Sequence, residues 1–241
     1  MRMIRAWLLM LCATLPVFAQ FDSTPLPATR YYVVFLRPDP SRQPLANIDA
    51  ERIQAAHMAN IHKMADDGVL VSAGPFDDTP KTISGIFVFK VDSLESAKTI
   101  AAKDPTVLEH RNTVDIHVWD GPPAIGDEYF RLHKLDPKTP ENMQDHPLFL
   151  LSRGPAWDVK EIHRDELLLA HERYILELKS RGKLGAAGRI EPPDDLLGLV
   201  IFRPISFAEA EQLTTDDPAV KAGLLHVELH HWWSSDHVLP W

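Results

Sequence analysis

Residues 56–76 read AHMANIHKMADDGVLVSAGPF, and residues 170–190 read AHERYILELKSRGKLGAAGRI. Aligned without a gap at an offset of 114 residues, both segments have Ala-His at the start, a glycine in the middle and Ala-Gly near the end. A second match joins DPTVLEHRNTVDIHVW from Asp104 to DPAVKAGLLHVELHHW from Asp217, at an offset of 113. Because the matches keep their order at nearly one offset, the sequence predicts two copies of one structural unit.

Each copy predicts the same order of strands and helices. Near-continuous apolar runs at 31–36 and 148–152 indicate a buried central strand. A helix is expected next, at 49–66 and 161–180, and Gly68 and Gly182 fit its C-terminal stop. Further strands are expected at 69–76, 83–91 and 113–119 in the first copy, and at 183–190, 196–203 and 225–233 in the second.

A second helix in each copy is predicted from a capping box, Asp92-x-x-Glu95 or Ser206-x-x-Glu209. The resulting order is the ferredoxin-like split βαβ unit, βαββαβ, which leaves one face of its sheet bare. We therefore expect an α+β fold in which two ferredoxin-like βαββαβ repeats pack sheet to sheet, as an intrachain dimeric α+β barrel. The expected domains are a signal peptide at 1–19, repeats at 29–120 and 146–233, a linker at 121–145 and a C-terminal tail at 234–241.

The N-terminal segment has the features of a secretory signal peptide. Arg2 and Arg5 precede a short apolar run, and Val17-Phe18-Ala19 offers a small residue for cleavage after Ala19. The apolar run is shorter than the roughly 20 residues that a membrane-spanning helix needs. The pattern predicts an exported bacterial protein, periplasmic or secreted, whose mature chain has no stable membrane insertion.

Composition narrows the partners of the mature chain. Cys12 is the only cysteine and lies in the signal peptide, so we expect no disulfide, no thiolate nucleophile and no cysteine-based zinc site. The net charge is −9, and removal of two arginines with the signal peptide leaves −11. An acidic surface repels phosphate backbones, so nucleic acid is not an expected partner. A small-molecule ligand fits better, and further self-association of two chains stays open.

The patterns H-x-x-x-[IL], G-x-L-x-x-A-G-P and a later D-P are similar to those of the YCII-related domain family. The first copy carries them at His57, Gly68, Leu70, Ala73, Gly74, Pro75, Asp104 and Pro105. The second copy departs at Arg189, where the first has Pro75, and the first departs at His110, where the second has Gly223. The resemblance implies a dimeric α+β barrel with a histidine and an aspartate as acid–base groups. Some relatives are dehydrochlorinases or resemble muconolactone isomerases.

His57 and His171 are the candidate catalytic histidines. Each lies on one apolar helix face, with Ile53, Asn60 and Met64 around the first and Leu167, Tyr174 and Leu178 around the second. An imidazole beside a carboxylate can move a proton near neutral pH. The alternative is a core histidine that hydrogen-bonds the backbone or a neighbouring side chain.

Asp104 and Asp217 are the preferred carboxylate partners, because both copies keep a histidine and a D-P together. Asp followed by Pro is also typical of a helix N-cap with proline at the first helical position, and that interpretation stays open. Asp66 lies about 13.5 Å and half a turn from His57 along the helix, which excludes a direct bond. Asp77 and Asp78 are third choices or simple turn residues.

Strand alternation places His226, Glu228 and His230 on one face. Two histidines and a carboxylate can bind zinc where their side chains converge on one point. Neighbours on one flat strand rarely converge on one ion, and His117, the counterpart of His230, has no such set. We expect solvated or inter-repeat polar contacts there and no metal site. Trp119 and Trp232 occupy matching strand ends and are interpreted as packing anchors.

Two functions remain open. One is cofactor-free proton-transfer chemistry of lyase or isomerase type on a small organic molecule, with His57 or His171 as the base and Asp104 or Asp217 orienting it. The other is a non-catalytic exported scaffold or small-ligand-binding module, in which the histidines only fill the core.

Overall fold

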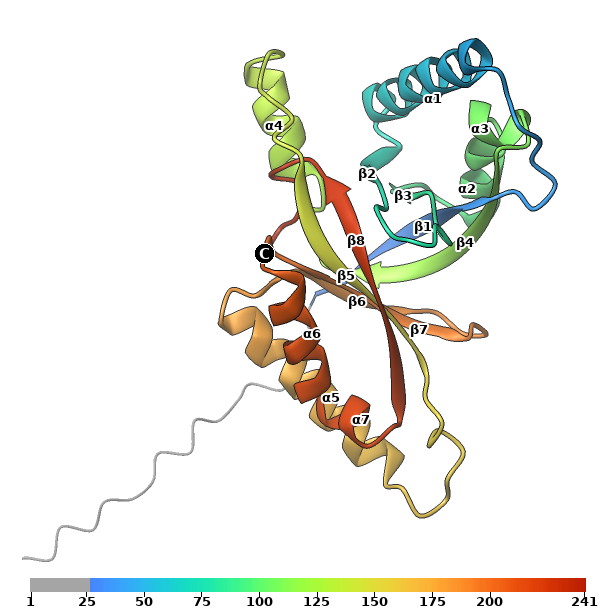
Figure 1. Ribbon diagram of the computed structural model, residues 1–241. Helices are drawn as coiled ribbons and strands as arrows, with labels where there is room; N and C mark the ends of the chain where they lie inside the picture. Colours follow the sequence, from blue (N-terminus) through green and yellow to red (C-terminus); the bar gives the residue numbers. More distant parts are fainter. Residues whose placement is uncertain (1–26) are drawn as a thin grey trace, which may run out of the picture.

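The computed structural model describes residues 27–241, and the expected signal peptide with Cys12 lies outside them. Two repeats of the same element order are joined by a segment with one additional helix (Figure 1). The first repeat comprises β1 (Thr29–Pro38), α1 (Asn47–Asp66), β2 (Leu70–Pro75), β3 (Gly85–Phe89), α2 (Leu94–Ala101), α3 (Pro105–Leu108) and β4 (Asn112–Gly121). After α4 (Asp127–Leu135), the second comprises β5 (Gln144–Arg153), α5 (Arg164–Ser180), β6 (Leu184–Ile190), β7 (Leu196–Phe202), α6 (Phe207–Asp216), α7 (Pro218–Lys221) and β8 (Leu225–Ser234).

The predicted βαββαβ order is confirmed, and the ends of elements shift by a few residues. Gly68 and Gly182 end α1 and α5 with φ of +73° and +66°, as the helix-stop pattern predicts. Ser206 caps α6 by accepting from the backbone N of Glu209 at 3.2 Å. The N-cap expected at Asp92 is wrong, because Ser93 has the extended backbone and caps α2 instead.

The connector departs from the expected linker. It contains the helix α4, although its prolines and glycines favour a loop. The strand β5 begins at Gln144, within the range expected for the linker. Gly126 precedes α4 in the left-handed region at φ +80°, and Tyr129 and Phe130 of the helix pack against the barrel core. A segment with loop-like composition therefore folds because its two aromatic residues find an apolar surface.

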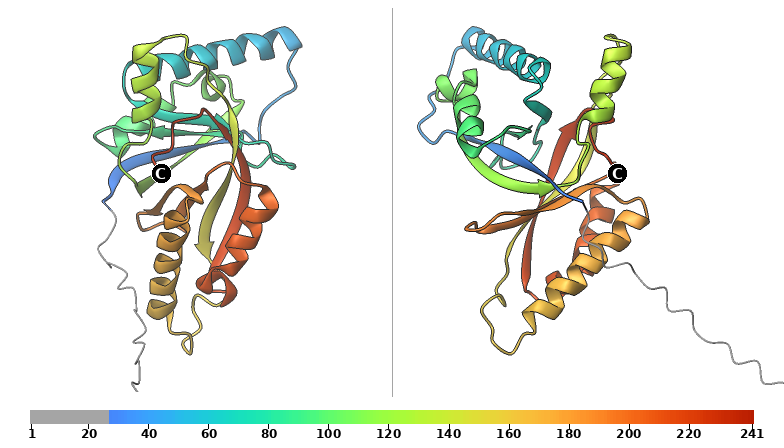
Figure 2. Two further views of the ribbon diagram at one scale, coloured as in Figure 1. Left: turned by 90° about the vertical axis from the view of Figure 1, so that its left-hand side faces the viewer. Right: turned by 180° about the vertical axis from the view of Figure 1, so that it is seen from behind.

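The eight strands form one antiparallel sheet in the order β2-β3-β1-β4-β6-β7-β5-β8. The repeats join where Trp119 and Asp120 of β4 pair with Ile190 and Arg189 of β6. At the other end Phe76, just after β2, bridges Trp232 of β8. The sheet thus closes on itself as a barrel, with α1–α3 outside one half and α5–α7 outside the other (Figures 1 and 2).

The two junctions are equivalent, and a glycine makes each one possible. A Cβ on Gly74 would lie 1.8 Å from the carbonyl O of Trp233, and a Cβ on Gly188 would lie 2.1 Å from that of Asp120. Each glycine also lies under the indole of the other repeat, because the Nε1 of Trp232 or Trp119 would be within 2.7 Å of the same Cβ. Glycine recurs in both copies because only an absent side chain lets the backbones of the repeats approach.

The core has three layers. Side chains from both repeats fill the barrel interior, and a separate apolar cluster lies beneath the helices of each repeat. β1 shows why its sequence is a continuous apolar run, since Val33 and Phe35 face the interior while Val34 and Leu36 face the helices. Trp119 and Trp232 are fully buried in the interior, which confirms them as packing anchors.

The C-terminal tail returns to the second repeat. Val238 is buried in the barrel core and its carbonyl accepts from the N of Gly126, so the tail and the connector meet. Trp241 packs under α5, with Lys179 Nζ 4.2 Å from its ring centre. Among residues 27–241, no helix combines the length and apolarity that crossing a bilayer requires.

Candidate functional site

The first candidate pair joins α1 to the start of α3. The Nδ1 of His57 lies 2.8 Å from Oδ2 and 3.0 Å from Oδ1 of Asp104. The imidazole also lies against Phe87 of β3, with 5.8 Å between ring centres, so it is on the sheet side of the helix. Asp104 is fully buried, whereas the His57 side chain is 13% exposed. The predicted pairing of these two residues is therefore present in the fold.

Three further donors hold the Asp104 carboxylate. Asn60 donates its side-chain amide to Oδ2 at 3.0 Å, and Thr106 donates both its backbone N–H at 3.0 Å and its hydroxyl at 2.6 Å to Oδ1. Burial pushes the pKa of Asp104 upward, but the hydrogen bonds from His57, Thr106 and Asn60 outweigh burial and hold it below its ordinary value. The carboxylate thus stays charged and keeps accepting from His57.

The second repeat builds an equivalent pair. The Nδ1 of His171 on α5 lies 2.5 Å from Oδ2 of Asp217. The backbone N–H groups of Ala219 and Val220 donate to Oδ1 at 2.8 and 3.4 Å. His171 is 14% and Asp217 6% exposed, close to the values of the first pair. The repeat therefore preserves a geometry and not just two residue types.

Both interpretations of the D-P motif hold at once. Asp104 and Asp217 are the N-caps of α3 and α7, each with proline following at the first helical position. The same carboxylates accept from His57 and His171. The cap fixes each carboxylate on rigid backbone, and the histidine uses the oxygen that remains.

The two pairs differ in one neighbour on the same helix face. Asn60 donates to Asp104, whereas its counterpart Tyr174 donates its hydroxyl to the carbonyl of Leu213 at 2.9 Å. Burial raises the pKa of Tyr174 to about 12, so its hydroxyl stays protonated. Asn60 was predicted to share this face but not to contact the carboxylate, because its counterpart in the other repeat is not an amide.

The second ring nitrogen of each histidine is open. The Nε2 atoms of His57 and His171 make no hydrogen bond with another residue of the described chain, and neither is enclosed by protein. With Nδ1–H donated to a carboxylate, a neutral imidazole presents Nε2 as a lone-pair acceptor. This arrangement of base and orienting carboxylate is able to take a proton from a bound molecule and return it.

The other candidate carboxylates do not reach His57. Asp66 makes no hydrogen bond to it among the described contacts, as the helical spacing predicts. Asp78 lies elsewhere, where it accepts from Nδ1 of His230 at 2.7 Å and from the backbone N of His231 at 3.0 Å. The third-choice assignment of Asp78 to His57 is wrong because the loop after β2 turns toward the other repeat.

Two histidine–carboxylate contacts cross between the repeats, and the sequence did not reveal the partners. His230 of β8 pairs with Asp78, and His117 of β4 pairs through Nδ1 with Asp194, after β6. Their Nε2 atoms are buried and face a second carboxylate, at 3.1 Å from Asp115 Oδ1 for His117 and 3.3 Å from Glu228 Oε1 for His230, whereas the Nε2 atoms of His57 and His171 are not buried. The expectation of inter-repeat polar contacts at His230 is confirmed. The pattern of an acidic residue two positions before the histidine recurs in β4 and β8, and it was the available signal for these contacts. The partners Asp78 and Asp194 lie in loops that do not align residue by residue between the two repeats.

The set of His226, Glu228 and His230 is only partly assembled, since Oε1 of Glu228 lies 3.3 Å from Nε2 of His230. Among residues 27–241, no three His, Cys, Asp or Glu side chains are grouped so that they could hold a metal ion. His226 and Glu228 are exposed while His230 is buried. Arg189, where the first copy has Pro75, is exposed and forms an ion pair with Glu172.

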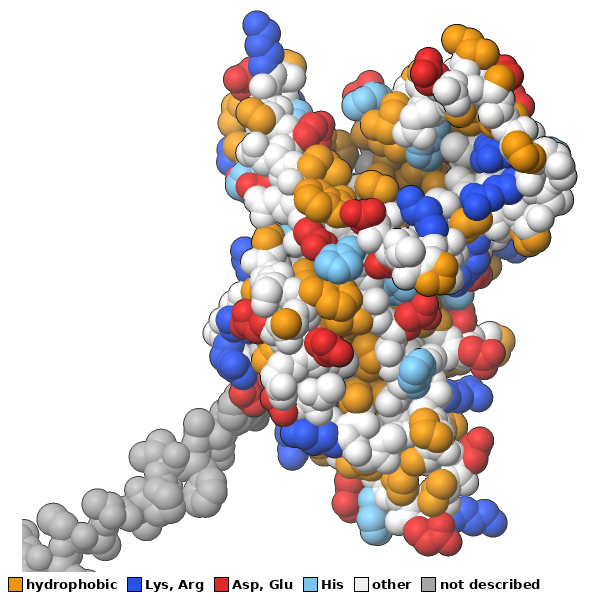
Figure 3. Space-filling model, viewed as in Figure 1, with side chains coloured by type: hydrophobic (Ala, Val, Ile, Leu, Met, Phe, Trp, Pro, Cys, Tyr) orange, Lys and Arg blue, Asp and Glu red, His pale blue; other side chains and the backbone are white. Residues whose placement is uncertain are grey.

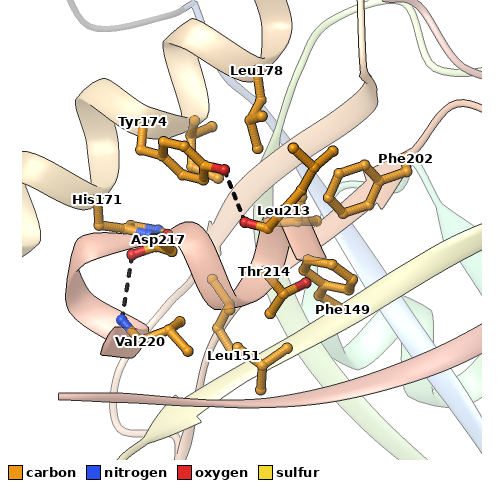
Figure 4. A pocket seen from close by; sticks show the side chains of 13 residues that line it. Phe149, Leu151, His171, Tyr174, Leu178, Phe202, Leu213, Thr214, Asp217 and Val220 are labelled. Atoms are coloured by element: carbon orange, nitrogen blue, oxygen red, sulfur yellow. Dashed lines mark hydrogen bonds and ion pairs between the residues drawn. The ribbon is translucent and has the colours of Figure 1, made fainter. Parts of the chain in front are cut away.

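Figure 4 shows the space beside His171, between α5, α6 and the sheet. It is lined by His171, Tyr174, Leu213 and Thr214 over Phe149 and Leu151 of β5. The volume that a water can occupy there is about 10 Å³, which is room for one water at most. On its sheet side the pair therefore has room for no more than one water in this arrangement of side chains.

These features define the class of protein as a dimeric α+β barrel formed within one chain, with a histidine–aspartate pair in each half. The model of the YCII-related domain matches residues 31–120 and 144–232, and the chain belongs to this family. No curated protein matches the sequence.

Several solved structures share the fold across most of the chain. One variant of chlorite dismutase from Candidatus Nitrospira defluvii is 11% identical with a TM-score of 0.55, covering 87% of this chain and 93% of that one. Another variant of that enzyme is 10% identical with a TM-score of 0.54, covering 85% and 91%. A heme-binding protein from Thermus thermophilus is 13% identical with a TM-score of 0.49, covering 86% and 94%.

Proposed function

We propose that the mature chain is an exported bacterial enzyme that moves a proton on a small organic molecule, in a reaction of lyase or isomerase type. His57 and His171 act as bases, and Asp104 and Asp217 orient them. The observation that carries this proposal is the repeated geometry, with Nδ1 on a buried carboxylate and Nε2 open in both halves.

The chemistry follows from these residues alone. Asp104 keeps the Nδ1–H tautomer of His57, so Nε2 accepts the proton from the substrate. The charged carboxylate then stabilises the imidazolium that forms, as the orienting acid does in other base–carboxylate pairs. In an isomerisation the same imidazolium returns the proton to a second carbon as the double bond shifts. In an elimination it protonates the leaving group as the bond from carbon to that group breaks and a carbon–carbon double bond forms. This step needs no cofactor.

The shared fold does not carry over the activities named for the structural neighbours. Identities of 10–11% show the fold alone. A heme beside His171 does not fit the side chains in place, since the space there is only about 10 Å³. The proposed reaction is therefore derived from the histidine pairs and not from chlorite or heme chemistry.

The test is exchange of carbon-bound protons in D2O with residues 20–241. A panel of small unsaturated lactones and ketones is followed by NMR for deuterium incorporation, which detects proton abstraction before any product is known. Removal of a positioned base costs on the order of 100-fold or more in rate. We expect the double variant His57→Asn, His171→Asn to lose exchange by that factor, because asparagine donates to the carboxylate but is no base.

The matched control is His62→Asn, an exposed histidine on the same helix as His57. It should leave both exchange and the urea midpoint unchanged. If no compound exchanges faster with protein than with buffer, or if the double variant exchanges like wild type, the enzyme proposal is wrong. A double variant that also unfolds at much lower urea would favour the alternative, in which the histidines serve the core of a scaffold.

Export is a separate part of the proposal and has its own test. The full chain is expressed in a bacterial host, the periplasm and medium are separated from the cytoplasm, and the intact mass is measured. Cleavage after Ala19 gives a chain that begins at Gln20. Recovery of only the full-length mass in the cytoplasm would contradict export while leaving the chemistry proposal standing.

A further inference from the structure

A groove lies on the outer side of the second repeat, between α6, α7 and β8. Figure 3 shows hydrophobic side chains along this part of the surface in the view of Figure 1. Phe207 of α6 forms one wall, and Leu225, Val227 and Leu229 of β8 form the other. Its volume is about 440 Å³, within the range of sites that bind small molecules. It is far larger than the space beside His171.

The charged side chain of the groove is a carboxylate, which favours a cationic ligand. Glu211 of α6 and His226 of β8 line it, and the side chain of neither makes a hydrogen bond or ion pair with another described residue. None of the described lining residues is a lysine or an arginine. A carboxylate beside apolar walls attracts an ammonium group and repels an anion. The chain as a whole carries a net charge of −9, which acts in the same direction.

The groove is a property of the second repeat and not of the shared fold. At the position of Gly223 the first repeat has His110, and at the position of Glu211 it has Lys98. Gly223 lines the groove without a side chain, at φ +69°. Compared with the first repeat, the second repeat therefore lacks a bulky side chain at one position and has a negative instead of a positive charge at the other. These two differences mark a binding preference that the first repeat does not share.

The groove also shares walls with the space beside the catalytic pair. Thr214, Val220 and Val227 line both. Val220 belongs to α7, the short helix whose N-cap is Asp217, and its backbone N–H is one of the donors to that carboxylate. A molecule in the groove therefore touches the helix that positions the carboxylate of His171.

We propose that this groove is the ligand compartment of the second repeat and takes a small organic amine with an apolar ring or chain. The apolar body lies along Val227 and Leu229, and the ammonium group donates to Glu211. The statement that such an amine is the substrate rests on the proposed function. The preference of the groove for an amine over an anion of the same shape does not.

Three probes of one shape test the preference: benzylamine, benzyl alcohol and benzoate. Each is titrated into residues 20–241 labelled at valine and leucine methyl groups, and the shifts are read by NMR. We expect saturable shifts at Val227 and Leu229, with benzylamine binding at least about tenfold more tightly than benzoate. We also expect the Val220 methyl and the His171 ring signals to move when the groove is filled.

Two variants copy the first repeat into the second. Glu211→Lys should reverse the order of benzylamine and benzoate, and Gly223→His should weaken all three probes. Lys98→Glu in the first repeat is the matched control and should change neither. Because Glu211 is on an exposed helix surface, its variant keeps the test valid even if Gly223→His fails to fold.

The outcomes separate this inference from the proposed function. Equal affinity for benzylamine and benzoate, or no saturable shift at Val227, overturns the amine groove whatever the exchange assay gives. Shifts at Val227 without any movement of the His171 signals overturn the link to the catalytic pair. Loss of exchange in the histidine variants with benzylamine binding intact leaves both proposals standing.

Discussion

The two repeats of this barrel place a histidine on a buried aspartate in the same way, yet surround the aspartate differently. Asp104 accepts four hydrogen bonds, including one from Asn60, while Asp217 accepts three and Tyr174 bonds elsewhere. Gly74 and Gly188, which are kept in both halves, let the two repeats approach and close the barrel. The side chains that differ between the halves, such as Asn60 and Tyr174, indicate where the two sites have different properties.

The largest expected effect concerns the glycines at the junctions. Gly74→Ala places a methyl group against the backbone of the other repeat, as does Gly188→Ala. Backbone cannot give way as a flexible side chain does, so we expect a loss of about 3 kcal/mol in the free energy of unfolding for each. Urea unfolding followed by circular dichroism measures it.

Gly68→Ala is the comparison for the junction variants. Gly68 has φ +73° but open space around it, so alanine there costs about 1 kcal/mol from backbone strain alone. If Gly74→Ala is no more damaging than Gly68→Ala, the close approach of the repeats is wrong. If only one of the two junction glycines is sensitive, the junctions are not equivalent in strength.

The second prediction compares the two carboxylates. Asp104→Ala leaves the backbone N–H of Thr106 and the amide of Asn60 without a partner in a buried site, and should cost about 3 kcal/mol. Asp217→Ala should cost about 2 kcal/mol, because Asp217 accepts fewer bonds and is slightly exposed. Asp66→Ala, at an exposed position of α1, should change the urea midpoint little. Equal losses at Asp104 and Asp217 would contradict the difference between the sites.

Much of the fold could be predicted because each sequence signal occurs in both copies, so that one copy supports the interpretation of the other. The two apolar strands, Gly68 and Gly182, and the paired D-P motifs each appear in both copies, so local signals agree with the global order. Features that occur once had no such support. α4 was missed because the prolines and glycines around it favour a loop, while its stability comes from packing of Tyr129 and Phe130 on the barrel.

The same reason limits what could be predicted of the site. His57 with Asp104 was found because His171 and Asp217 repeat it at nearly the same offset. Asn60 was not singled out, since its counterpart is a tyrosine. Asp194 could not be matched to His117 because the contact joins two repeats through a loop, and sequence spacing carries no information about such closure.

A third prediction uses pH to measure what Asn60 contributes. The pKa of Asp104 is lowered in the folded state, so its stabilisation is present above the ordinary carboxyl pKa of about 3.9 and is lost as pH falls through the folded pKa. Asn60→Leu removes one of the bonds that lower this pKa. The pKa should rise toward its ordinary value, and the fall in urea midpoint below about pH 4 should become shallower.

Tyr174→Phe is the matched change in the second repeat. It removes a hydroxyl that bonds to the Leu213 carbonyl and not to Asp217, so it should cost about 1 kcal/mol without altering the slope at acid pH. An identical acid slope for wild type and Asn60→Leu would mean that His57 and Thr106 alone hold the charge of Asp104.

The smallest expected effect is a difference in pH dependence between His146 and its counterpart Tyr31. The two residues are counterparts because Tyr31 of β1 pairs with Trp119 and His146 of β5 pairs with Trp232. Both are buried, but only the imidazole titrates near neutral pH. Burial lowers the pKa of His146, whose Nδ1 donates to the Phe202 carbonyl at 3.0 Å. A lowered histidine pKa means that stability is full above the ordinary value of about 6.5 and falls as pH drops below it.

His146→Asn keeps a donor for the Phe202 carbonyl and cannot take up a proton in this range. The variant should therefore show a flatter dependence of the urea midpoint between about pH 7 and 5, with only a modest loss at pH 7. His226→Asn, at an exposed position, should keep the wild-type slope. If the slope is unchanged in His146→Asn but altered in a variant of His117 or His230, the prediction is wrong. The pH-sensitive group would then lie at the contact between the repeats and not within the second repeat.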